Sequence, residues 1–203
     1  MSGLAHYFEN DEHLKSEPKV IEYTIFDRHF SLNSDAGIFS KDQIDGGSFA
    51  FLKVLIPLHL SGRLLDVGCG YGTLGLTLAT FSPHLQVTML DVNARAVTLA
   101  RANAHALGLS PRVTVLESDI YQSLPAQQFD SIVINPPIRA GKKVIYAMFD
   151  GAHDYLINGG SLFIVIRKSH GAPSAATYIA SRFGRCDLLK KDKGYYIYQA
   201  VKK

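Results

Sequence analysis

Short apolar segments alternate with longer amphipathic segments along the chain after Gly62. Five of the apolar segments have the length of strands and read as buried on both faces, and four segments with helical periodicity lie between or after them. This alternation is typical of a mostly parallel sheet with helices on both faces. The expected strands are 63–67, 86–91, 113–118, 129–135 and 161–166, and the expected helices are 73–81, 93–107, 142–156 and 174–183.

The start of the chain has a different pattern. Residues 19–26 and 30–32 are rich in β-forming side chains and flank a polar turn, which predicts a hairpin. Glycine, serine and aspartate are frequent in the segment that follows. Residues 49–58 are then mostly apolar and predict a helix that begins near Asp45 or Ser48.

The last segments add two strands to the expected sheet. Residues 186–189 and 195–200 flank a lysine-rich turn, which predicts a terminal antiparallel hairpin. We therefore expect an α/β fold of the Rossmann-like kind, with a seven-stranded and mostly parallel sheet. Residues 1–60 are expected to form an N-terminal extension that contains the β-hairpin and the helix, and residues 61–203 are expected to form the core.

Composition excludes several classes of protein. With 203 residues, 47% of them hydrophobic, the chain can bury the core of one domain, which excludes a disordered or fibrous protein. Its longest apolar run of strand type, 162–166, is far shorter than the roughly 20 residues of a membrane span. Glu9, Asp11 and Glu12 stand where a signal peptide would be basic and apolar, so we expect a cytoplasmic protein without a membrane partner. Two cysteines, and eight histidines without ligand spacing, predict no metal site.

Three glycines follow the first strand of the alternating region, at positions 68, 70 and 72. Glycines at such a point let the backbone turn sharply and let a ligand approach the main chain. In an open α/β sheet this loop lies at the carboxyl ends of the strands, where ligands bind. Gly68, Gly70 and Gly72 are therefore candidate cofactor-binding residues.

Acidic residues end the next two strands. Asp91 follows Gly68 by 23 residues, where a carboxylate can accept hydrogen bonds from both hydroxyls of a ribose. Asp119 ends the third strand and, with the backbone of Ile120, is placed to meet an adenine edge. Together with the glycines, these positions predict a binding site for an adenosine.

The loop spacing and Asp66 distinguish between adenosine cofactors. A dinucleotide site carries a small third residue in Gly-x-Gly-x-x-Gly or Ala, but Thr73 stands at that position. Asp66 also adds a negative charge close to where a pyrophosphate would lie. That charge repels phosphate and attracts the sulfonium and amino groups of S-adenosylmethionine. We therefore expect S-adenosylmethionine rather than NAD as the cofactor, with Asp66 at its methionine end.

The fourth strand ends in Asn135-Pro136-Pro137. Two prolines make a rigid, extended turn, because each holds its φ at about −65° and lacks a backbone N–H. The amide oxygen of Asn135 and the carbonyl of Pro136 then remain as acceptors for one ligand. Two fixed acceptors suit an exocyclic amino group, whose delocalised lone pair they orient toward an incoming methyl group. Asn135 and Pro136 are therefore the expected catalytic residues, and Asn135 is also expected to contact the cofactor.

These motifs resemble those of the class I S-adenosylmethionine-dependent methyltransferases, and the Asn-Pro-Pro turn resembles the signature of the branch that methylates amino groups. With Gly37-Ile38-Phe39-Ser40 and Asp45-Gly46-Gly47-Ser48, the chain is similar to the small-domain family that contains the ribosomal RNA guanine-N2 methyltransferases. The resemblance implies methyl transfer to an exocyclic amine of an RNA base, with guanine N2 of ribosomal RNA as the expected target.

The residue after the prolines departs from this pattern. It is usually aromatic in this branch and stacks on the target base, but here it is Ile138. Stacking is then expected from Phe39, Tyr146 or Phe149, or from the guanidinium of Arg139. The expected substrate-binding residues are Phe39, Pro137, Ile138, Arg139 and Lys142.

Positive charge is concentrated in the second half of the chain. Residues 1–100 hold 7 lysines and arginines against 11 acidic residues, whereas residues 101–203 hold 14 against 7. Arg139 and Lys142 lie just after the Asn-Pro-Pro turn, and their charge predicts a polyanionic partner. The expected partner is RNA, as ribosomal RNA or a ribosomal subunit, and the expected oligomeric state is a monomer or a homodimer.

Two other functions remain open. A glutamine carboxamide also has a delocalised nitrogen, so the Asn-Pro-Pro turn is compatible with protein glutamine N5-methylation. A non-catalytic RNA-binding module that keeps the methyltransferase fold is the second alternative. The presence of Asp66, Asp91 and Asn135 together disfavours this second alternative.

Overall fold

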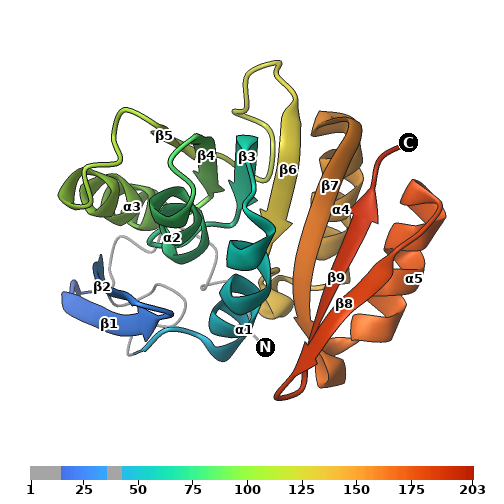
Figure 1. Ribbon diagram of the computed structural model, residues 1–203, viewed down its shortest axis with the longest axis horizontal. Helices are drawn as coiled ribbons and strands as arrows, with labels where there is room; N and C mark the ends of the chain where they lie inside the picture. The colour runs from blue at the N-terminus through green and yellow to red at the C-terminus, as the bar shows by residue number, and fades with distance from the viewer. Residues whose placement is uncertain (1–14, 36–42) are drawn as a thin grey trace.

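The computed structural model describes residues 15–35 and 43–203, which form two sheets flanked by helices (Figure 1). A two-stranded antiparallel hairpin contains β1 (Lys19–Ile25) and β2 (Arg28–Ser34). The seven-stranded sheet has the order β5 (Val113–Glu117), β4 (Leu85–Asp91), β3 (Gly62–Val67), β6 (Phe129–Ile134), β7 (Leu156–Arg167), β9 (Tyr195–Val201) and β8 (Asp187–Asp192). The first five strands of this order run parallel, and β9 is antiparallel to both neighbours. The expected α/β fold with a terminal antiparallel hairpin is thereby confirmed.

Helices cover both faces of the large sheet (Figure 1). One face carries α1 (Gly46–Leu55), α2 (Thr73–Phe81) and α3 (Ala94–Ala106), which share a hydrophobic cluster with the hairpin. The other face carries α4 (Lys142–Tyr155) and α5 (Ala172–Phe183), whose buried side chains belong to a second cluster. Short 3-10 helices occur at η1 (Ile56–Leu58), η2 (Ile138–Ala140) and η3 (Lys168–His170). In the described part of the chain, no helix is long and apolar enough to cross a bilayer.

The expected elements are all present, but some of their boundaries differ. The helix expected at 49–58 begins at Gly46 and is followed by η1, with Asp45 as its N-cap. Asp45 is one of the two starts that the sequence predicted; the apolar run begins later because glycine, which disfavours a helix interior, occupies the first two helical positions. Strand β8 extends to Asp192, so that part of the expected lysine-rich turn lies in an edge strand, where exposed lysines are common. The division into an extension, 1–60, and a core, 61–203, stays a prediction.

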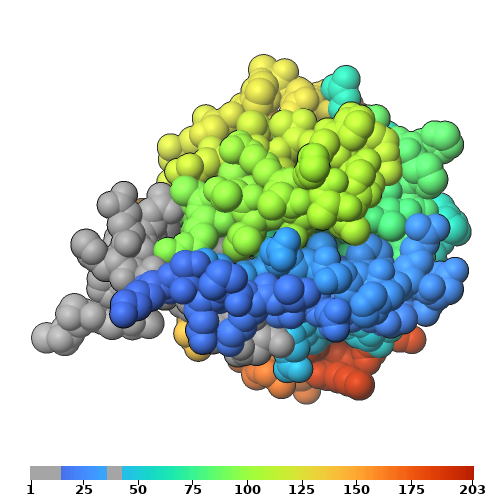
Figure 2. Space-filling model, turned by 90° about the vertical axis from the view of Figure 1, so that its left-hand side faces the viewer, coloured from blue at the N-terminus to red at the C-terminus, as the bar shows by residue number. Residues whose placement is uncertain are grey.

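The hairpin packs on the helical layer through one face. Side chains alternate between buried and exposed along most of both strands, as in strands that cover a core on one side. Tyr23 belongs to the buried face, and its hydroxyl lies 2.6 Å from Oγ1 of Thr77 on α2. Figure 2 shows the hairpin as a blue band beneath the green surface that contains α3. Residues before the parallel core therefore contribute to the same hydrophobic cluster as α2 and α3.

Asn103 on α3 links the hairpin to the glycine loop. The residue is 1% exposed, and its Oδ1 accepts a hydrogen bond from the backbone N–H of Asn33 at 2.8 Å. Its Nδ2 donates to the carbonyls of Asn33 and Tyr71, each at 2.9 Å. Tyr71 lies within the glycine loop, so one buried amide joins β2, α3 and that loop.

Asn103→Ala is expected to destabilise the protein, because the substitution leaves the buried carbonyl of Tyr71 and the part-buried backbone groups of Asn33 without this partner. Unsatisfied buried groups cost about 1–3 kcal/mol each, so we expect the free energy of unfolding to fall by about 2–4 kcal/mol. Urea unfolding measures this change. Asn158→Ala, at an exposed asparagine, is the control, with an expected change below about 0.5 kcal/mol. Equal stability of the two variants would contradict the role of Asn103.

Candidate active site

The glycine loop runs from β3 to α2 and folds against the end of β4. The backbone N–H of Gly68 donates to the carbonyl of Leu90 at 2.8 Å. Gly68 and Gly70 have φ values of 77° and 56°, a region that favours glycine. A Cβ at Gly70 would meet no atom within 4 Å, so a ligand can approach the main chain there. A Cβ at Gly72 would instead collide with Leu76, which shows that this glycine also serves the packing of α2.

Asp66 lies beneath the loop, near the end of β3, and is 1% exposed. Its Oδ2 accepts a hydrogen bond from the backbone N–H of Gly75 at 2.9 Å. Its Oδ1 is buried and has no hydrogen-bond partner within the described residues. Burial, with a smaller contribution from the charge of Asp91, raises the pKa of Asp66 to about 7, although the Gly75 hydrogen bond opposes this shift. An unpartnered carboxylate oxygen fits the cationic group that the sequence led us to expect here.

Asp91 ends β4 and connects the glycine loop to α3. Its Oδ2 accepts a hydrogen bond from the N–H of Gly70 at 2.8 Å, and its Oδ1 accepts one from the N–H of Asn93 at 2.9 Å. Burial raises the pKa of Asp91, and these backbone hydrogen bonds oppose the shift. Each carboxylate oxygen can accept a second hydrogen bond. The geometry is therefore compatible with the predicted contact to a ribose diol.

Asp119 and Ile120 follow β5 and lie next to Asp91. The backbone N–H of Ser118 donates to the carbonyl of Asp91 at 2.9 Å and holds the two segments together. Asp119 is exposed. Ile120 has a φ of 53°, which is strained for a β-branched residue. Such strain persists where the surroundings hold the backbone in place.

Tyr121 provides that support, and sequence reasoning did not identify it. Its hydroxyl donates to the carbonyl of Met148 on α4 at 2.6 Å. Its ring stacks on Tyr155 with 5.0 Å between centroids. The ring also lies against Gly151, where any Cβ would collide with it. The segment after β5 is thus fixed by the helix on the opposite face of the sheet from α3.

The strand order places the predicted residues in one row. Strands β5, β4, β3 and β6 are neighbours, and Asp119, Asp91, the glycine loop and Asn135 lie at or just beyond their carboxyl ends in this order. Neighbouring strands lie about 4.8 Å apart, so the row extends over about 14 Å. Residues from four separate parts of the chain therefore form one elongated site at the edge where α/β proteins bind ligands.

Asn135 follows β6 and contacts the first turn of α1. Its Nδ2 donates to Oδ2 of Asp45 at 2.9 Å and to Oγ of Ser48 at 3.0 Å. An amide nitrogen has two protons, so both are used by α1. Its Oδ1 has no donor among the described residues. The predicted acceptor oxygen of Asn135 is therefore free for a ligand.

The residues of the proline turn have different degrees of exposure. Pro136 is buried, and its carbonyl has no donor within the described ranges, whereas the carbonyl of Pro137 accepts a hydrogen bond within η2 at 2.9 Å. Ile138 is half-buried against the cluster under α4. Arg139 and Lys142 are exposed. Pro136 thus retains the acceptor that its predicted role requires.

One of the residues expected to stack on a base is buried instead. Phe149 is 0% exposed within the cluster between α4 and the sheet, so the expectation that it binds the base is wrong. It lies on the apolar face of an amphipathic helix, which packs against the sheet. Tyr146 is half-buried and stacks on Tyr178 with 3.9 Å between centroids. Phe39 lies outside the described residues.

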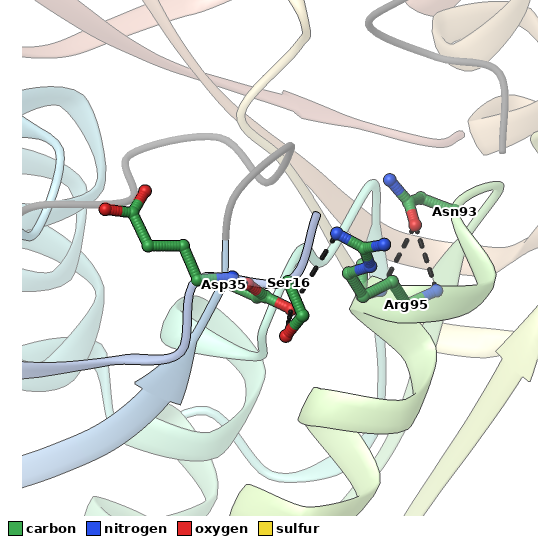
Figure 3. Close-up of polar contacts among 6 residues, drawn as sticks. Ser16, Asp35, Asn93 and Arg95 are labelled. Atoms are coloured by element: carbon green, nitrogen blue, oxygen red, sulfur yellow. Dashed lines mark hydrogen bonds and ion pairs between the residues drawn. The ribbon is translucent and has the colours of Figure 1, made fainter. Parts of the chain in front are cut away.

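A polar cluster of Ser16, Asp35 and Arg95 lies near the start of α3 and was not predicted from the sequence (Figure 3). Asp35, at the end of β2, accepts a hydrogen bond from Oγ of Ser16 at 2.8 Å and pairs with Arg95 of α3 at 3.7 Å. Arg95 lies two residues after Asn93, the N-cap of α3. The cluster therefore fixes the end of the hairpin beside the expected ribose site. No local pattern marks Asp35, because its partners lie in separate segments.

The raised pKa of Asp66 makes the stability of the fold depend on pH. An aspartate in an unfolded chain has a pKa of about 3.9, whereas the pKa of Asp66 in the folded chain is about 7. Between these values the folded state holds one more proton, so the contribution of Asp66 to the free energy of unfolding falls as pH rises from about 4 to about 7. Asp66→Asn keeps an oxygen for the N–H of Gly75 and is expected to remove this decline.

Urea unfolding at a series of pH values measures the difference between the variant and the wild type. We expect Asp66→Asn to gain stability relative to the wild type as pH rises through this window, with the full gain above a pH of about 7. Asp154→Asn, at a side chain that is 71% exposed, is the control and should show no such gain. A difference that does not change with pH would contradict the raised pKa of Asp66.

The chain matches the family model described as methyltransferase small domain over residues 29–199. It is 40% identical over 198 residues to the uncharacterized protein YbxB of Bacillus subtilis, with 97% of this chain and 98% of that relative covered. It is 33% identical over 197 residues to ribosomal RNA small subunit methyltransferase C of Erwinia tasmaniensis, with 93% of this chain and 56% of that relative covered. The chain thus spans about half the length of such ribosomal RNA methyltransferases.

A solved structure shares the same fold. The 16S rRNA N2 G1207 methyltransferase of Thermus thermophilus, in complex with AdoMet and guanosine, matches with a TM-score of 0.83 and 26% identity, covering 94% of this chain and 52% of that chain. The expected fold and enzyme class are confirmed by these matches, and the expected cofactor is the one present in the Thermus structure. The family model includes β2 except for its first residue, the glycine loop and the Asn-Pro-Pro turn. The chain therefore belongs to the methyltransferase small domain family.

Proposed function

We propose that this chain transfers the methyl group of S-adenosylmethionine to an exocyclic amine of an RNA base, with guanine N2 of ribosomal RNA as the target. The row formed by Asp119, Asp91, the glycine loop and Asn135 carries the proposal. From one end of the row to the other, these residues provide groups suited to bind an adenine, a ribose, the cationic methionine end of the cofactor and the amino group that accepts the methyl. The Thermus structure with AdoMet and guanosine supports the assignment of donor and target.

Three acidic residues have distinct roles in this proposal. Asp66 holds the amino group at the methionine end through its negative charge, because it lies buried beneath the glycine loop and one of its oxygens has no partner among the described residues. Asp91 binds the ribose with the lone pairs that the backbone leaves free. Asp119 and the backbone of Ile120 bind the adenine, with Gly68 and Gly70 leaving the main chain accessible between them.

The chemistry requires positioning and charge stabilisation rather than a strong base. S-adenosylmethionine, when bound, supplies an electrophilic methyl group on a sulfonium. Oδ1 of Asn135 and the carbonyl of Pro136 accept the two N–H groups of the amine and point its lone pair toward that methyl group. The nitrogen forms a bond to carbon as the carbon–sulfur bond breaks, and the two acceptors stabilise the positive charge that develops on nitrogen. One proton then leaves the nitrogen for water.

Basic residues near the catalytic turn support RNA as the partner. Helix α4 begins with Lys142 and Lys143, and it has neither an acidic residue in its first turn nor a side-chain cap. Lysines at a helix N-terminus oppose the helix dipole, so they do not favour the helix itself. Arg167 and Lys168 follow the buried part of β7 at the same edge of the sheet. These residues can contact phosphates of an RNA that places one base beside Asn135.

Asn135→Ala tests the role assigned to the amide. We expect methyl transfer in a single turnover to fall by about 10²–10³-fold, because an acceptor for the developing charge is lost. Affinity for S-adenosylmethionine, measured by calorimetry with NAD as the comparison ligand, is expected to remain within about threefold. Asn158→Ala, at an exposed position, is the control. Wild-type transfer by Asn135→Ala would contradict the assigned role.

The target is tested by supplying a labelled methyl group to undermethylated ribosomal RNA, to ribosomal subunits and to a ribosomal protein fraction. Digestion of the labelled RNA to nucleosides identifies the modified atom. We expect the label in N2-methylguanosine. Label in protein alone would contradict the RNA assignment and favour glutamine N5-methylation, and binding of NAD without S-adenosylmethionine would contradict the methyltransferase chemistry.

Arg139→Ala and Lys142→Ala test the proposed phosphate contacts. Each variant is expected to weaken RNA binding and to reduce the dependence of log affinity on log salt concentration by about one unit of slope. Affinity for S-adenosylmethionine should not change. Lys203→Ala is the matched control, because Lys203 is exposed at the opposite end of β9 from η3 (Figure 1). Equal salt dependence in all variants would contradict these contacts.

A further inference from the structure

The first turn of α1 contacts Asn135 through side chains to which the proposed chemistry gives no role. Nδ2 of Asn135 donates to Oδ2 of Asp45 at 2.9 Å and to Oγ of Ser48 at 3.0 Å. We propose that Asp45 and Ser48 are positioning residues, which set the orientation of the Asn135 amide and strengthen its oxygen as an acceptor. This inference rests on the proposed role of Asn135 in holding the substrate amine.

Orientation is decided by the chemistry of the two groups that face the amide nitrogen. An asparagine amide has an oxygen on one side and an NH₂ group on the other, and only the oxygen can accept a proton from a substrate amine. An ionised carboxylate can only accept, so Asp45 selects the orientation in which Asn135 turns its NH₂ group toward α1. The reversed amide would place two acceptors together at Asp45 and two donors together at the substrate.

The charge of Asp45 also changes the strength of the amide oxygen. A hydrogen bond from Nδ2 to a carboxylate is charge-assisted, and hydrogen bonds in a chain polarise one another. Electron density in the Asn135 amide therefore shifts toward Oδ1. A more negative Oδ1 stabilises the positive charge that develops on the substrate nitrogen better than an unassisted amide does.

Asp45 is itself held firmly by the start of the helix. Its Oδ1 accepts a hydrogen bond from the N–H of Gly47 at 2.8 Å, and its Oδ2 accepts one from the N–H of Ser48 at 2.8 Å. A Cβ at Gly47 would lie 3.0 Å from the ring of Tyr195 on β9, so the first turn of α1 lies close against that strand. The carboxylate is therefore fixed between the ends of β6 and β9, next to the residue that it positions.

A role as helix cap alone would account for Asp45 without any effect on Asn135, so the experiment must separate the two roles. Asparagine caps a helix about as well as aspartate. Asp45→Asn therefore keeps one oxygen as a helix cap, but it removes the negative charge beside Asn135 and one of the two oxygens that accept at this point. We expect single-turnover methyl transfer at saturating RNA to fall by about 100-fold. The melting temperature and the affinity for S-adenosylmethionine should remain close to the wild type.

Exchanging the two side chains gives a second test. Asn135→Asp alone places two carboxylates against each other, and we expect it to be slow as well. In the double variant Asp45→Asn/Asn135→Asp, the amide at position 45 donates to the carboxylate at position 135, whose other oxygen can accept from the substrate. We expect the double variant to be at least about tenfold faster than either single variant. A helix cap without a role in positioning predicts no such recovery.

Ser48→Ala tests the second contact, and a further variant serves as the control. Ser48→Ala removes one of the two acceptors of the Asn135 amide, and we expect methyl transfer to be about two- to tenfold slower. Asp192→Asn is the matched control, because Asp192 pairs with Lys53 on the same helix at 2.5 Å but does not contact Asn135. Wild-type transfer by Asp45→Asn, or a double variant no faster than the single ones, would overturn the proposal.

An observation on the free protein separates this inference from the proposed function. The side-chain N–H signals of Asn135 are identified in ¹⁵N spectra by their loss in Asn135→Ala. We expect both protons to exchange slowly with water in the wild type and at least about tenfold faster in Asp45→Asn. If no RNA accepts a methyl group, unchanged exchange in Asp45→Asn still overturns the inference. If RNA is methylated while Asp45→Asn transfers at the wild-type rate, the inference fails and the proposed function stands.

Discussion

Parallel pairing of β3 with β4 on one side and β6 on the other is the constraint on which the candidate site depends. The register pairs Leu65 with Thr88 and with Ile132, which brings the carboxyl ends of three strands to one edge. Because β3 is buried on both faces at its end, a shift by one residue would turn Asp66 toward the opposite helical layer. The same pairing that forms the core therefore sets the distances among residues that are far apart in the sequence.

Polar contacts from the first part of the chain complete this edge. Asn103 ties the hairpin to the glycine loop, Asp35 ties it to the start of α3, and Asp45 ties α1 to Asn135. Each link uses an amide or a carboxylate that is at least partly buried. A buried polar group without a partner is costly, so such links favour one arrangement of the hairpin and α1 over alternatives. The residues before β3 thereby contribute to the geometry of the site as well as to the hydrophobic core.

Much of the fold could be predicted because its signals are local. Hydrophobic period, glycines and prolines mark most element ends within a few residues, and α2 has the expected bounds. The N-cap of α1 is Asp45, one of the two starts that the sequence offered, although the glycines Gly46 and Gly47 of its first turn lie before the predicted apolar run. Phe149 was misassigned because spacing alone does not show which face of α4 packs on the sheet. Asp91 and Asn135 lie at one edge of the sheet, because the parallel strands that precede them end at a common edge.

The sequence by itself determined the alternation of strands and helices, the glycine loop with its acids, and the Asn-Pro-Pro turn. These features depend on backbone conformation and on residues within one or two elements. Only the tertiary structure decided that Asp45 accepts a hydrogen bond from Asn135, that one buried oxygen of Asp66 has no partner in the described ranges, and that Tyr121 supports the strained backbone at Ile120. The physical reason is that hydrogen bonding and burial depend on which distant segments meet, and local periodicity carries no information about those partners.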